Sequence, residues 1–569
     1  MTTARAIVGW TVLSLLFAVI LPGNPLTFTF VLVFLLACPG IAISGRLGLA
    51  DRAFSALLLV SGSLALDALV AGGLVTLHVY TGTRAIVILA ALAIAGAIFR
   101  RPVPAVTGHT ITRRRHRPAS GGDALDFDRS MPVLLVRVGH YPVYHGGVCA
   151  IRSFGRAGIP VHAIVEDRLT PAAASRYLES ARVWPTTGAE PAELLVEGLC
   201  RIGTELGTRA LAIPTDDESA VLLAEHGDAL REHFLYPDID PVLPRRLASK
   251  ENLHIMCSGY GIPQPEACFP RTFEDVVAFA AHARFPVVVK NVAPFARLHQ
   301  KAVGGTTVVR DPEALIALAA TFPSPRSAMF QEYIPREVAE DWIFQTYCDG
   351  NYNALVPFTG IKLRSWPPHA GVTTYARAVP NEELEALSVN FCRDIGYRGV
   401  CDLDWRFDRR DGRYKLVDFN PRPGAQFELF ATEAGVDVVR AMHLDLTGRS
   451  VPPAPVVRNS IRVEHLDLPS AVAYRGRHEP VPDGLDVRGH AAPVWVASDD
   501  PLPVFVMLVR VMGPALRRAA TSVFHRRSRT HAHAGPQTAR DDATTDSDPG
   551  SDADSGTETE TETETGAKV

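Results

Sequence analysis

The chain has 569 residues, with 57 basic and 61 acidic side chains and a formal net charge of -4. This length predicts more than one folding unit, because a single core rarely grows beyond about 250–300 residues. The near-neutral charge gives no argument for a nucleic-acid partner. Only six of the basic residues are lysines, and the eight cysteines show no CxxC spacing, which suits a reducing compartment.

The first hundred residues are expected to form an α-helical transmembrane domain. Apolar runs cover residues 6–21, 26–43, 53–80 and 85–99, and a spanning helix needs roughly 20 apolar residues. Because the first and last runs are short, the sequence predicts four spans, with two as the alternative. A cleaved signal peptide over the first run is also open, although no small-x-small cleavage site follows it.

Positive residues predict the orientation of this domain. Arg5, the loop at 46–52 and the arginines that follow position 100 fall on one side, and only Arg84 falls on the other. Both ends of the domain and everything after it are therefore expected at the cytoplasmic side of a cell membrane. Asp67 is either a functional intramembrane carboxylate or a hydrogen-bonding partner of a serine such as Ser63.

A linker rich in proline, arginine, glycine and serine covers residues 101–130, and an α/β pattern begins after it. The first elements are expected at 132–138, 146–158 and 161–165. The loop at 139–147 does not match GxGxxG, so residues 131–240 are predicted to be Rossmann-like without a bound dinucleotide. His140 and His145 in this loop either line a site at the strand ends or are solvated.

A strand that ends in lysine and a glycine turn indicate a phosphate-binding region. Residues 286–290 have the pattern of a buried strand that ends at Lys290, whose ammonium group can reach a nucleotide phosphate. Gly304, Gly305 and Thr306 form a turn whose backbone amides can hold phosphate oxygens. Alone, such a turn usually marks only a hairpin.

The next apolar strand ends in Glu332, Tyr333 and Ile334. A segment of this kind can present backbone groups to the edge of an adenine ring. Asp341, a few residues further on, could hold ribose hydroxyls. Each of these features carries little weight alone.

Two alternating strands at 399–408 and 414–422 predict a buried hairpin with acidic side chains. Asp418 and Asn420 are two residues apart and share a face, and Asp404 on the partner strand can face them. This oxygen-only set suits Mg²⁺ or Mn²⁺ held between protein and ATP phosphates. Arg422 follows on the same face, where it could stabilise a developing anion. The alternative is an exposed hairpin with solvated acids, but the apolar residues beside them argue for burial.

The C-terminal part of the chain divides into an extension at 451–529 and an acidic tail at 530–569. The extension ends in an apolar and then strongly basic segment, at 501–529, that either lies on an anionic membrane surface or packs as a terminal helix on the core. The tail is rich in serine, threonine, aspartate and glutamate and has no aromatic residue. It is predicted to be disordered, because it cannot bury enough apolar area to fold.

Taken together, residues 131–450 resemble the ATP-grasp superfamily, in the branch of carbamoyl-phosphate synthetase, biotin carboxylase and the carboxylate–amine ligases. The resemblance places the ATP-grasp domain at 241–450, and aspartate at position 418 departs from the glutamate usual there. It also assigns roles to single residues: phosphate-contacting lysines Lys250 and Lys290, lid loop Gly304-Gly305, adenine hinge Glu332, Tyr333 and Ile334, ribose contact Asp341, magnesium ligands Asp404, Asp418 and Asn420, and catalytic arginine Arg422.

The resemblance implies a membrane-anchored ligase that phosphorylates a small-molecule carboxylate with Mg-ATP and joins the acyl phosphate to an amine. Acceptor recognition is then expected from residues 360–374, where Lys362, a further candidate nucleotide contact, lies near Arg364, and from residues 423–428. Arg364 would either grip a carboxylate or form a surface salt bridge. A non-catalytic nucleotide-binding membrane sensor and an ATP-dependent carboxylase remain the alternatives, and a homodimer is compatible with the sequence.

Overall fold

The computed structural model describes residues 10–14, 31, 34–35, 63, 86–92, 125–292, 302–303, 306–368, 371–474 and 491–511. The chain divides into two compact units, Met1–Arg114 and Arg115–Val569. In the described part of the chain, no helix is both long and apolar enough to cross a bilayer. The predicted spans lie almost wholly outside the described residues, as do Asp67 and the acidic tail.

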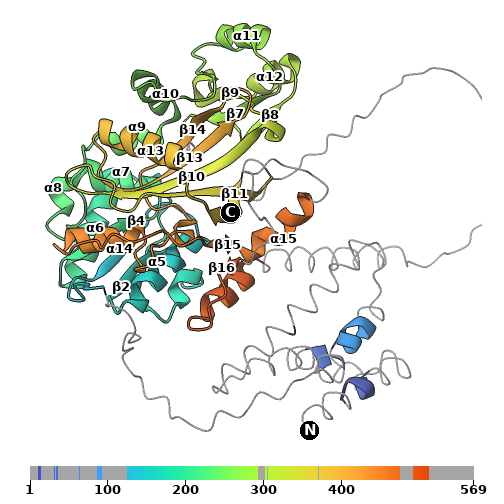
Figure 1. Ribbon diagram of the computed structural model, residues 1–569. Helices are drawn as coiled ribbons and strands as arrows, with labels where there is room; N and C mark the ends of the chain where they lie inside the picture. The colour runs from blue at the N-terminus through green and yellow to red at the C-terminus, as the bar shows by residue number, and fades with distance from the viewer. Residues whose placement is uncertain are drawn as a thin grey trace, which may run out of the picture. The chain divides into compact units, whose positions relative to one another are not determined.

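The second unit begins with a five-stranded parallel sheet in the order β3-β2-β1-β4-β5 (Figure 1). Its strands are predominantly apolar, and β1 is buried along its whole length, as expected where helices cover both faces of a parallel sheet. This is the Rossmann-like topology predicted from sequence. The elements are β1 (Val133–Val136), α5 (His145–Arg156), β2 (Val161–Val165), η1 (Pro171–Ala174), β3 (Leu178–Val183), α6 (Ala192–Leu206), β4 (Ala210–Pro214), α7 (Asp217–Glu225), α8 (Gly227–Leu230) and β5 (Phe234–Leu235).

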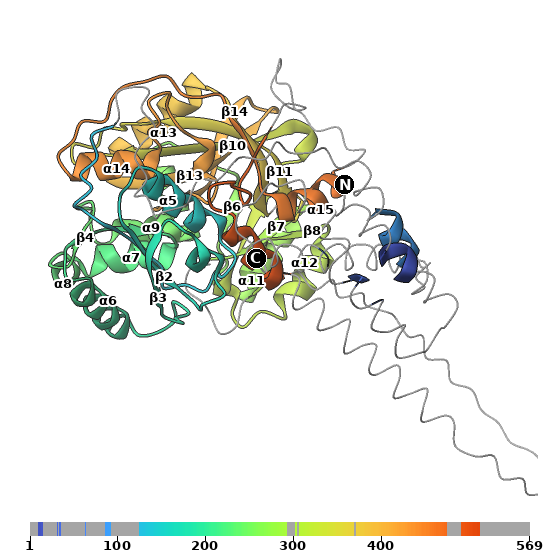
Figure 2. The ribbon, with the colours of Figure 1, turned by 90° about the horizontal axis from the view of Figure 1, so that it is seen from below.

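A smaller antiparallel sheet follows, in the order β6-β9-β7-β8. Two helices, α11 and α12, complete it, and Figures 1 and 2 both show them grouped with β7 and β8. The group has a hydrophobic core of its own, which includes Val287, Val289 and Phe330. The elements are β6 (Ala267–Cys268), α11 (Phe273–His282), β7 (Val287–Asn291), β8 (Thr307–Val309), α12 (Pro312–Ala319), η2 (Pro325–Ser327) and β9 (Ala328–Glu332).

The largest sheet has seven strands in the order β14-β13-β10-β11-β12-β15-β16. Helices α9 (Leu243–Ala248) and α10 (Lys250–Gly259) come before it in the chain. Its own elements are η3 (Arg336–Val338), β10 (Ala339–Cys348), β11 (Phe358–Trp366), β12 (Val372–Ala378), α13 (Glu382–Asp394), β13 (Gly399–Asp408), β14 (Arg413–Asn420), η4 (Phe427–Leu429), α14 (Val438–Leu446), β15 (Ser460–Arg462), α15 (Glu464–Ala473) and β16 (Ala492–Pro493).

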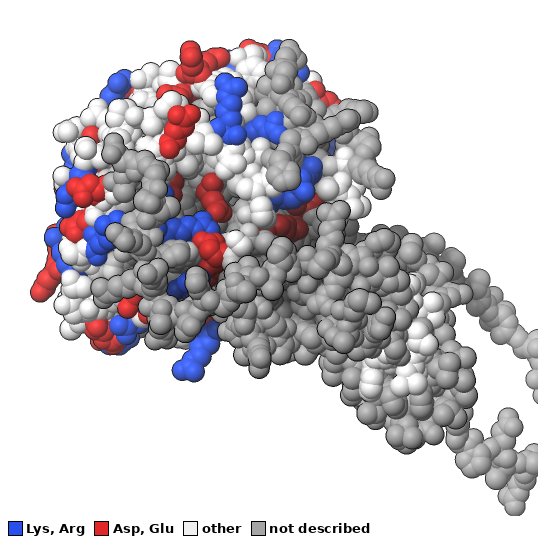
Figure 3. Space-filling model, turned by 60° about the horizontal axis from the view of Figure 1, so that its bottom comes forward, with Lys and Arg blue, Asp and Glu red and all other residues white. Residues whose placement is uncertain are grey.

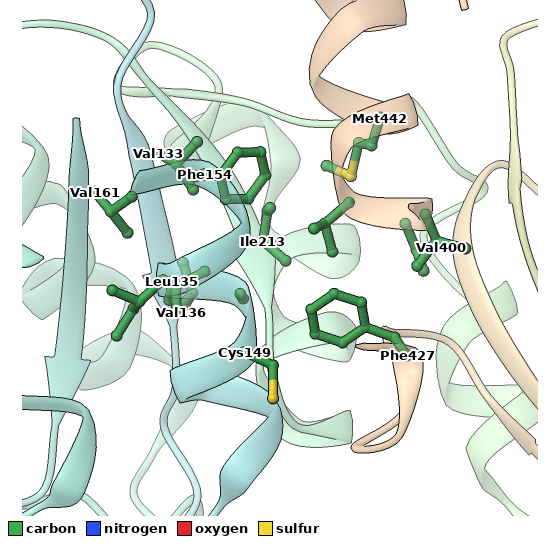
Figure 4. Packing of buried hydrophobic residues seen from close by; sticks show 14 of the residues in the cluster. Val133, Leu135, Val136, Cys149, Phe154, Val161, Ile213, Val400, Phe427 and Met442 are labelled. Carbon is green, nitrogen blue, oxygen red and sulfur yellow. The ribbon is translucent and has the colours of Figure 1, made fainter. Parts of the chain in front are cut away.

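The two faces of the large sheet belong to different cores, because side chains alternate along each strand. Trp342 and Phe344 pack with residues of α9, α10 and α13. Ile343 and Tyr347 join α14 and the parallel sheet. Figure 4 shows part of this shared core, with Ile213 lying between the β1 side chains and Val400 and Met442. The parallel sheet and the large sheet are therefore held together by one continuous apolar core.

The C-terminal extension is tied to the parallel sheet by a buried arginine. Arg152 of α5 donates to Asp500 Oδ2 at 3.0 Å and to the carbonyl oxygens of Val494 and Trp495. Arg152 and Asp500 are each 1 % exposed. Helical residues 502–511 follow, and Met507 is buried in the same core. Of the two alternatives for 501–529, this described part packs on the core.

Candidate active site

A cleft of about 450 Å³ lies where the small sheet faces the large one. Its walls come from β7 and β9 on one side and from β10, β11, β13 and β14 on the other. Most of the residues predicted to bind nucleotide or metal line it: Lys250, Lys290, Thr306, Glu332, Tyr333, Ile334, Asp341, Lys362, Asp404 and Asp418. The predicted lid residues Gly304 and Gly305 lie outside the described residues.

The two predicted metal carboxylates face each other across the β13–β14 hairpin. Asp404 and Asp418 are direct partners in the strand register. Each has a lysine beside it: Lys362 Nζ lies 2.6 Å from Asp404 Oδ1, and Lys250 forms an ion pair with Asp418. Burial raises the pKa of Asp418, but the ammonium of Lys250 outweighs it, and the net shift is downward. The carboxylate of Asp418 is therefore ionised at neutral pH.

Asn420 is placed differently from the prediction. Its register partner is Asp402 rather than Asp404. Its amide Nδ2 donates to Asp402 Oδ2 at 3.2 Å, and its Oδ1 accepts a hydrogen bond from Arg422 Nη2 at 3.1 Å. Asn420 is buried and does not line the cleft, whereas Asp404 and Asp418 do, so the two carboxylates are the better-placed metal donors.

The donor set fits a magnesium ion that is shared with a substrate. No group of three or more histidine, cysteine, aspartate or glutamate side chains could hold a metal within the described ranges. Two opposed carboxylates remain, and Mg²⁺ is commonly held by one or two carboxylates together with substrate phosphates. Asp404 and Asp418 therefore suit a metal that arrives with ATP, rather than one caged by protein alone.

Lys290 stands at the end of β7 with its ammonium group in the cleft. Its Nζ donates to Gln331 Oε1 at 2.9 Å. Burial, and the nearby charge of Lys250, lower the pKa of Lys290 to about 8. The structure gives it no carboxylate partner at ion-pair distance among the described residues, so a polyanion in the cleft would be its natural counter-ion.

The predicted hinge is braced by charged side chains from the large sheet. Glu332 accepts from Arg410 at 2.5 Å and lies 3.8 Å from Lys415 Nζ. Arg406 donates to the carbonyl oxygen of Ile334 at 2.7 Å. Lys415, for which the sequence indicated no role, therefore belongs to the support of this segment.

Asp341, the predicted ribose contact, is engaged by two arginines. Arg406 Nη1 lies 2.7 Å from one carboxylate oxygen and Arg336 Nη2 lies 3.2 Å from the other. A carboxylate has about four acceptor sites, so Asp341 can still accept from a ligand hydroxyl. The prediction was incomplete because it did not include the arginines.

Arg422 lies just beyond the hairpin and joins the large sheet to the parallel sheet. Its Nε donates to Asp217 Oδ1 at 3.0 Å. Asp217 occupies the first turn of α7, after the N-cap residue Asp216. Burial lowers the pKa of Arg422, but the carboxylate of Asp217 raises it and prevails. The guanidinium is therefore a cation. The charges of Asp418 and Lys250 act on Asp217 as well, so both residues lie near this ion pair.

Asp402 is a buried acid that the sequence prediction missed. It is 3 % exposed and accepts hydrogen bonds from Gln345 and Gln426, at 2.9 and 3.2 Å. Burial and the neighbouring charge of Asp404 raise the pKa of Asp402 to about 7. The same two-residue spacing that grouped Asp418 with Asn420 would have placed Asp402 beside Asp404.

Two candidates for substrate or site residues have structural partners instead. Arg364 donates to both carboxylate oxygens of Asp467, at 2.7 and 2.9 Å, so its fork is occupied and the salt-bridge alternative holds. His145 is buried against Trp495, with ring centroids 6.3 Å apart, whereas His140 is exposed. Sequence alone cannot reveal such partners, because Asp467 and Trp495 come from distant segments.

Comparison with curated proteins finds a ligase. The D-aspartate ligase of Enterococcus faecium (strain Aus0004) is 27% identical over 308 residues, which cover 51% of this chain and 71% of that protein. No protein-family model matches the chain.

Solved structures with a similar arrangement also exist. An L-amino acid ligase from Bacillus licheniformis has a TM-score of 0.42 at 15% identity, with coverage of 56% of this chain and 74% of its own. N5-carboxyaminoimidazole synthetase from Staphylococcus aureus has a TM-score of 0.44 at 11% identity, with coverage of 60% and 83%. At these TM-scores the likeness carries no conclusion about activity.

Proposed function

We propose that this chain is an ATP-dependent ligase of the ATP-grasp type. It activates a carboxylate with Mg-ATP as an acyl phosphate and joins it to an amine, with formation of a C–N bond. The observation that carries the proposal is that one cleft holds Lys250, Lys290 and Lys362 together with the opposed carboxylates Asp404 and Asp418, two of the lysines being paired with them. The similarity to a D-aspartate ligase supports an ATP-dependent C–N ligase and favours an aspartate-like acid.

The basic and acidic residues of the cleft have different roles in this reaction. Lys290 and Lys250 neutralise ATP phosphate oxygens as compact point charges. Asp404 and Asp418 hold Mg²⁺, which when bound neutralises the phosphates and orients them. Arg422 follows at the hairpin end, where a guanidinium can hold the anion that develops during transfer. Positioning and charge neutralisation then account for most of the rate enhancement.

We also place this ligase at the cytoplasmic face of a cell membrane, anchored through the first hundred residues. The apolar runs at 6–99 and the arginines that flank them support this placement. On the face shown in Figure 3, acidic and basic side chains are interspersed. Membrane fractionation of the full chain, with and without alkaline carbonate washing, tests the anchor.

The activity is tested with the full chain in detergent, Mg-ATP, D-aspartate and hydroxylamine. Hydroxylamine traps an acyl phosphate as a hydroxamate, so ADP and hydroxamate should appear together and only when the acid is present. L-Aspartate and D-alanine serve as comparison acids. ATP binding without acid-dependent ADP release, across this set of acids, would instead identify a nucleotide sensor.

A further inference from the structure

The second half of the proposed reaction needs a proton acceptor. An aliphatic amine is an ammonium ion at neutral pH, as the lysine side chain shows, and has no lone pair for attack until it loses a proton. Lys250 and Arg422 are cations that only donate, and Lys290, whose pKa is lowered to about 8, binds the ATP phosphates in the proposed reaction, which favour its charged form. The remaining candidates are the carboxylates beside Arg422 that have an oxygen an incoming amine can reach.

Most acids near Arg422 are already engaged. Asp216 accepts from the backbone N–H of Ser219 with one oxygen and of Gly139 with the other, at 2.8 and 2.7 Å. Asp402 is buried and held by glutamine and asparagine amides. Asp418 pairs with Lys250 and faces the proposed metal.

Asp217 is the exception. Its Oδ1 accepts from Arg422 Nε at 3.0 Å, and its side chain is 22 % exposed. Among the described residues no donor contacts its Oδ2. Burial raises the pKa of Asp217 despite the opposing charge of Arg422, and a less acidic carboxylate is a better proton acceptor.

The location of Asp217 also matches the direction from which an acceptor must come. It stands at the N-terminus of α7, directly after β4, where the strands of the parallel sheet end. In open α/β sheets, ligands bind outside the carboxyl ends of the strands. The ion pair with Arg422 brings this edge to the hairpin end of the ATP cleft, so an amine bound there would lie next to an acyl phosphate formed beside Asp418.

We propose that Asp217 contacts the incoming amine and acts as its general base, an inference that rests on the ligase function proposed above. One proton passes from the ammonium nitrogen to Asp217 Oδ2, and from there to solvent. The freed lone pair forms the C–N bond with the acyl carbon, and the C–O bond to phosphate breaks with its electron pair on the phosphate oxygen. A second proton leaves nitrogen with the departing phosphate, which gives an amide and hydrogen phosphate.

A purely structural role for Asp217, as the partner that holds Arg422, makes a different prediction. In that case its loss would weaken acyl phosphate formation as well, because Arg422 would be misplaced in both half-reactions. Asp217→Asn separates the two roles. The amide keeps a similar shape and an oxygen that can accept from Arg422, but it cannot take a proton.

The experiment compares two nucleophiles in the wild type, in Asp217→Asn and in the control Asp238→Asn, all with D-aspartate and Mg-ATP. Asp238 is 80 % exposed and lies in a surface ion pair with Arg231. Hydroxylamine is uncharged at neutral pH and needs no base, whereas ammonium does. ADP, hydroxamate and amide are measured at pH 7, with ammonium and L-lysine as the charged nucleophiles.

Asp217→Asn is expected to retain hydroxamate formation at close to the wild-type rate. It should lose about 10²-fold or more of the rate with charged amines, which is the usual effect of a general base, and Asp238→Asn should resemble the wild type. Equal losses with both nucleophiles, or no loss with either, overturn the inference. If the wild type makes hydroxamate but uses neither charged amine, protection of Asp217 from carbodiimide labelling by L-lysine decides, and no protection also overturns it. A wild type that makes no hydroxamate contradicts the ligase proposal itself.

Discussion

Lys290 leads to a prediction in which stability and nucleotide binding change in opposite directions. The perturbation is Lys290→Met, which removes the ammonium group from the cleft and keeps most of the side-chain volume. Without a ligand, the folded protein holds this cation in a buried place, and folding therefore opposes its charge. With ATP bound, the same cation gains its counter-ion.

The size of the expected stability change follows from the pKa shift of Lys290. The pKa of Lys290 falls from 10.5 to about 8, and each unit corresponds to about 1.4 kcal/mol, so the charged form costs on the order of 3 kcal/mol. The side chain is half-buried, which reduces this figure. Methionine also leaves Gln331 Oε1 without its donor, a loss of about 1–3 kcal/mol. We therefore expect Lys290→Met to raise the free energy of unfolding by about 1 kcal/mol at pH 7.

The sign of the pH dependence separates this explanation from a packing effect. Because the folded pKa lies below the unfolded one, the unfolded chain binds more protons between about pH 8 and 10.5, and stability from this group rises with pH across that window. The rise should be absent in Lys290→Met. Denaturant unfolding of both proteins at pH 7, 8.5 and 10 measures it.

The affinity for nucleotide should change with pH in the opposite direction to stability. ATP favours the charged form of Lys290, so the affinity of the wild type for Mg-ATP should weaken as pH rises above about 8, and Lys290→Met should bind weakly throughout. Lys290→Arg keeps the charge but not the compact ammonium, so it should fold and yet use ATP poorly. Wild-type turnover in Lys290→Arg, or a clearly less stable Lys290→Met, would refute the reasoning.

Three further predictions concern structure and metal. Arg152→Met should lower the free energy of unfolding by about 3–5 kcal/mol, because it leaves the buried carboxylate of Asp500 without its charged partner, and denaturant midpoints measure this loss. Arg364→Met should destabilise the chain through Asp467 and leave the KM for the acid within about twofold, since it removes no substrate contact; a large rise in KM would restore a substrate role. EDTA should stop ADP release, and Asp418→Asn should raise the Mg²⁺ concentration needed for half-maximal rate by about tenfold or more; an unchanged requirement would remove Asp418 from the metal site.

Local sequence patterns were sufficient to predict much of the fold and many of the residues that line the cleft. Period-two alternation predicted the strand at 399–408 with the bounds of β13, and the register places Asp404 opposite Asp418 as expected. A run of valines that ends in lysine likewise predicted β7 and Lys290. These features depend on neighbours in sequence, so the sequence alone reveals them.

The partners of the predicted residues could not be found in this way. Asp217 and Arg422 are 205 positions apart, and Arg364 and Asp467 are 103 apart. Pairs of this kind depend on how the sheets pack against each other, and the periodicity of the sequence does not reveal that packing. Asp217 nevertheless had a local signal, since it follows β4 at the ligand-binding edge of a parallel sheet.

The arrangement of charge in the cleft has a consequence for how it accepts ATP. Lys250 and Lys362 are each paired with a carboxylate, Asp418 and Asp404. A metal–polyphosphate offers a cation to each carboxylate and anionic oxygens to each lysine. Each charged side chain therefore exchanges one partner for another on binding, and no buried charge is left unpaired. Free nucleotide without metal offers the lysines a partner but leaves both carboxylates without one. The site should therefore discriminate strongly between Mg-ATP and metal-free ATP, because both ion pairs exchange partners when the nucleotide binds.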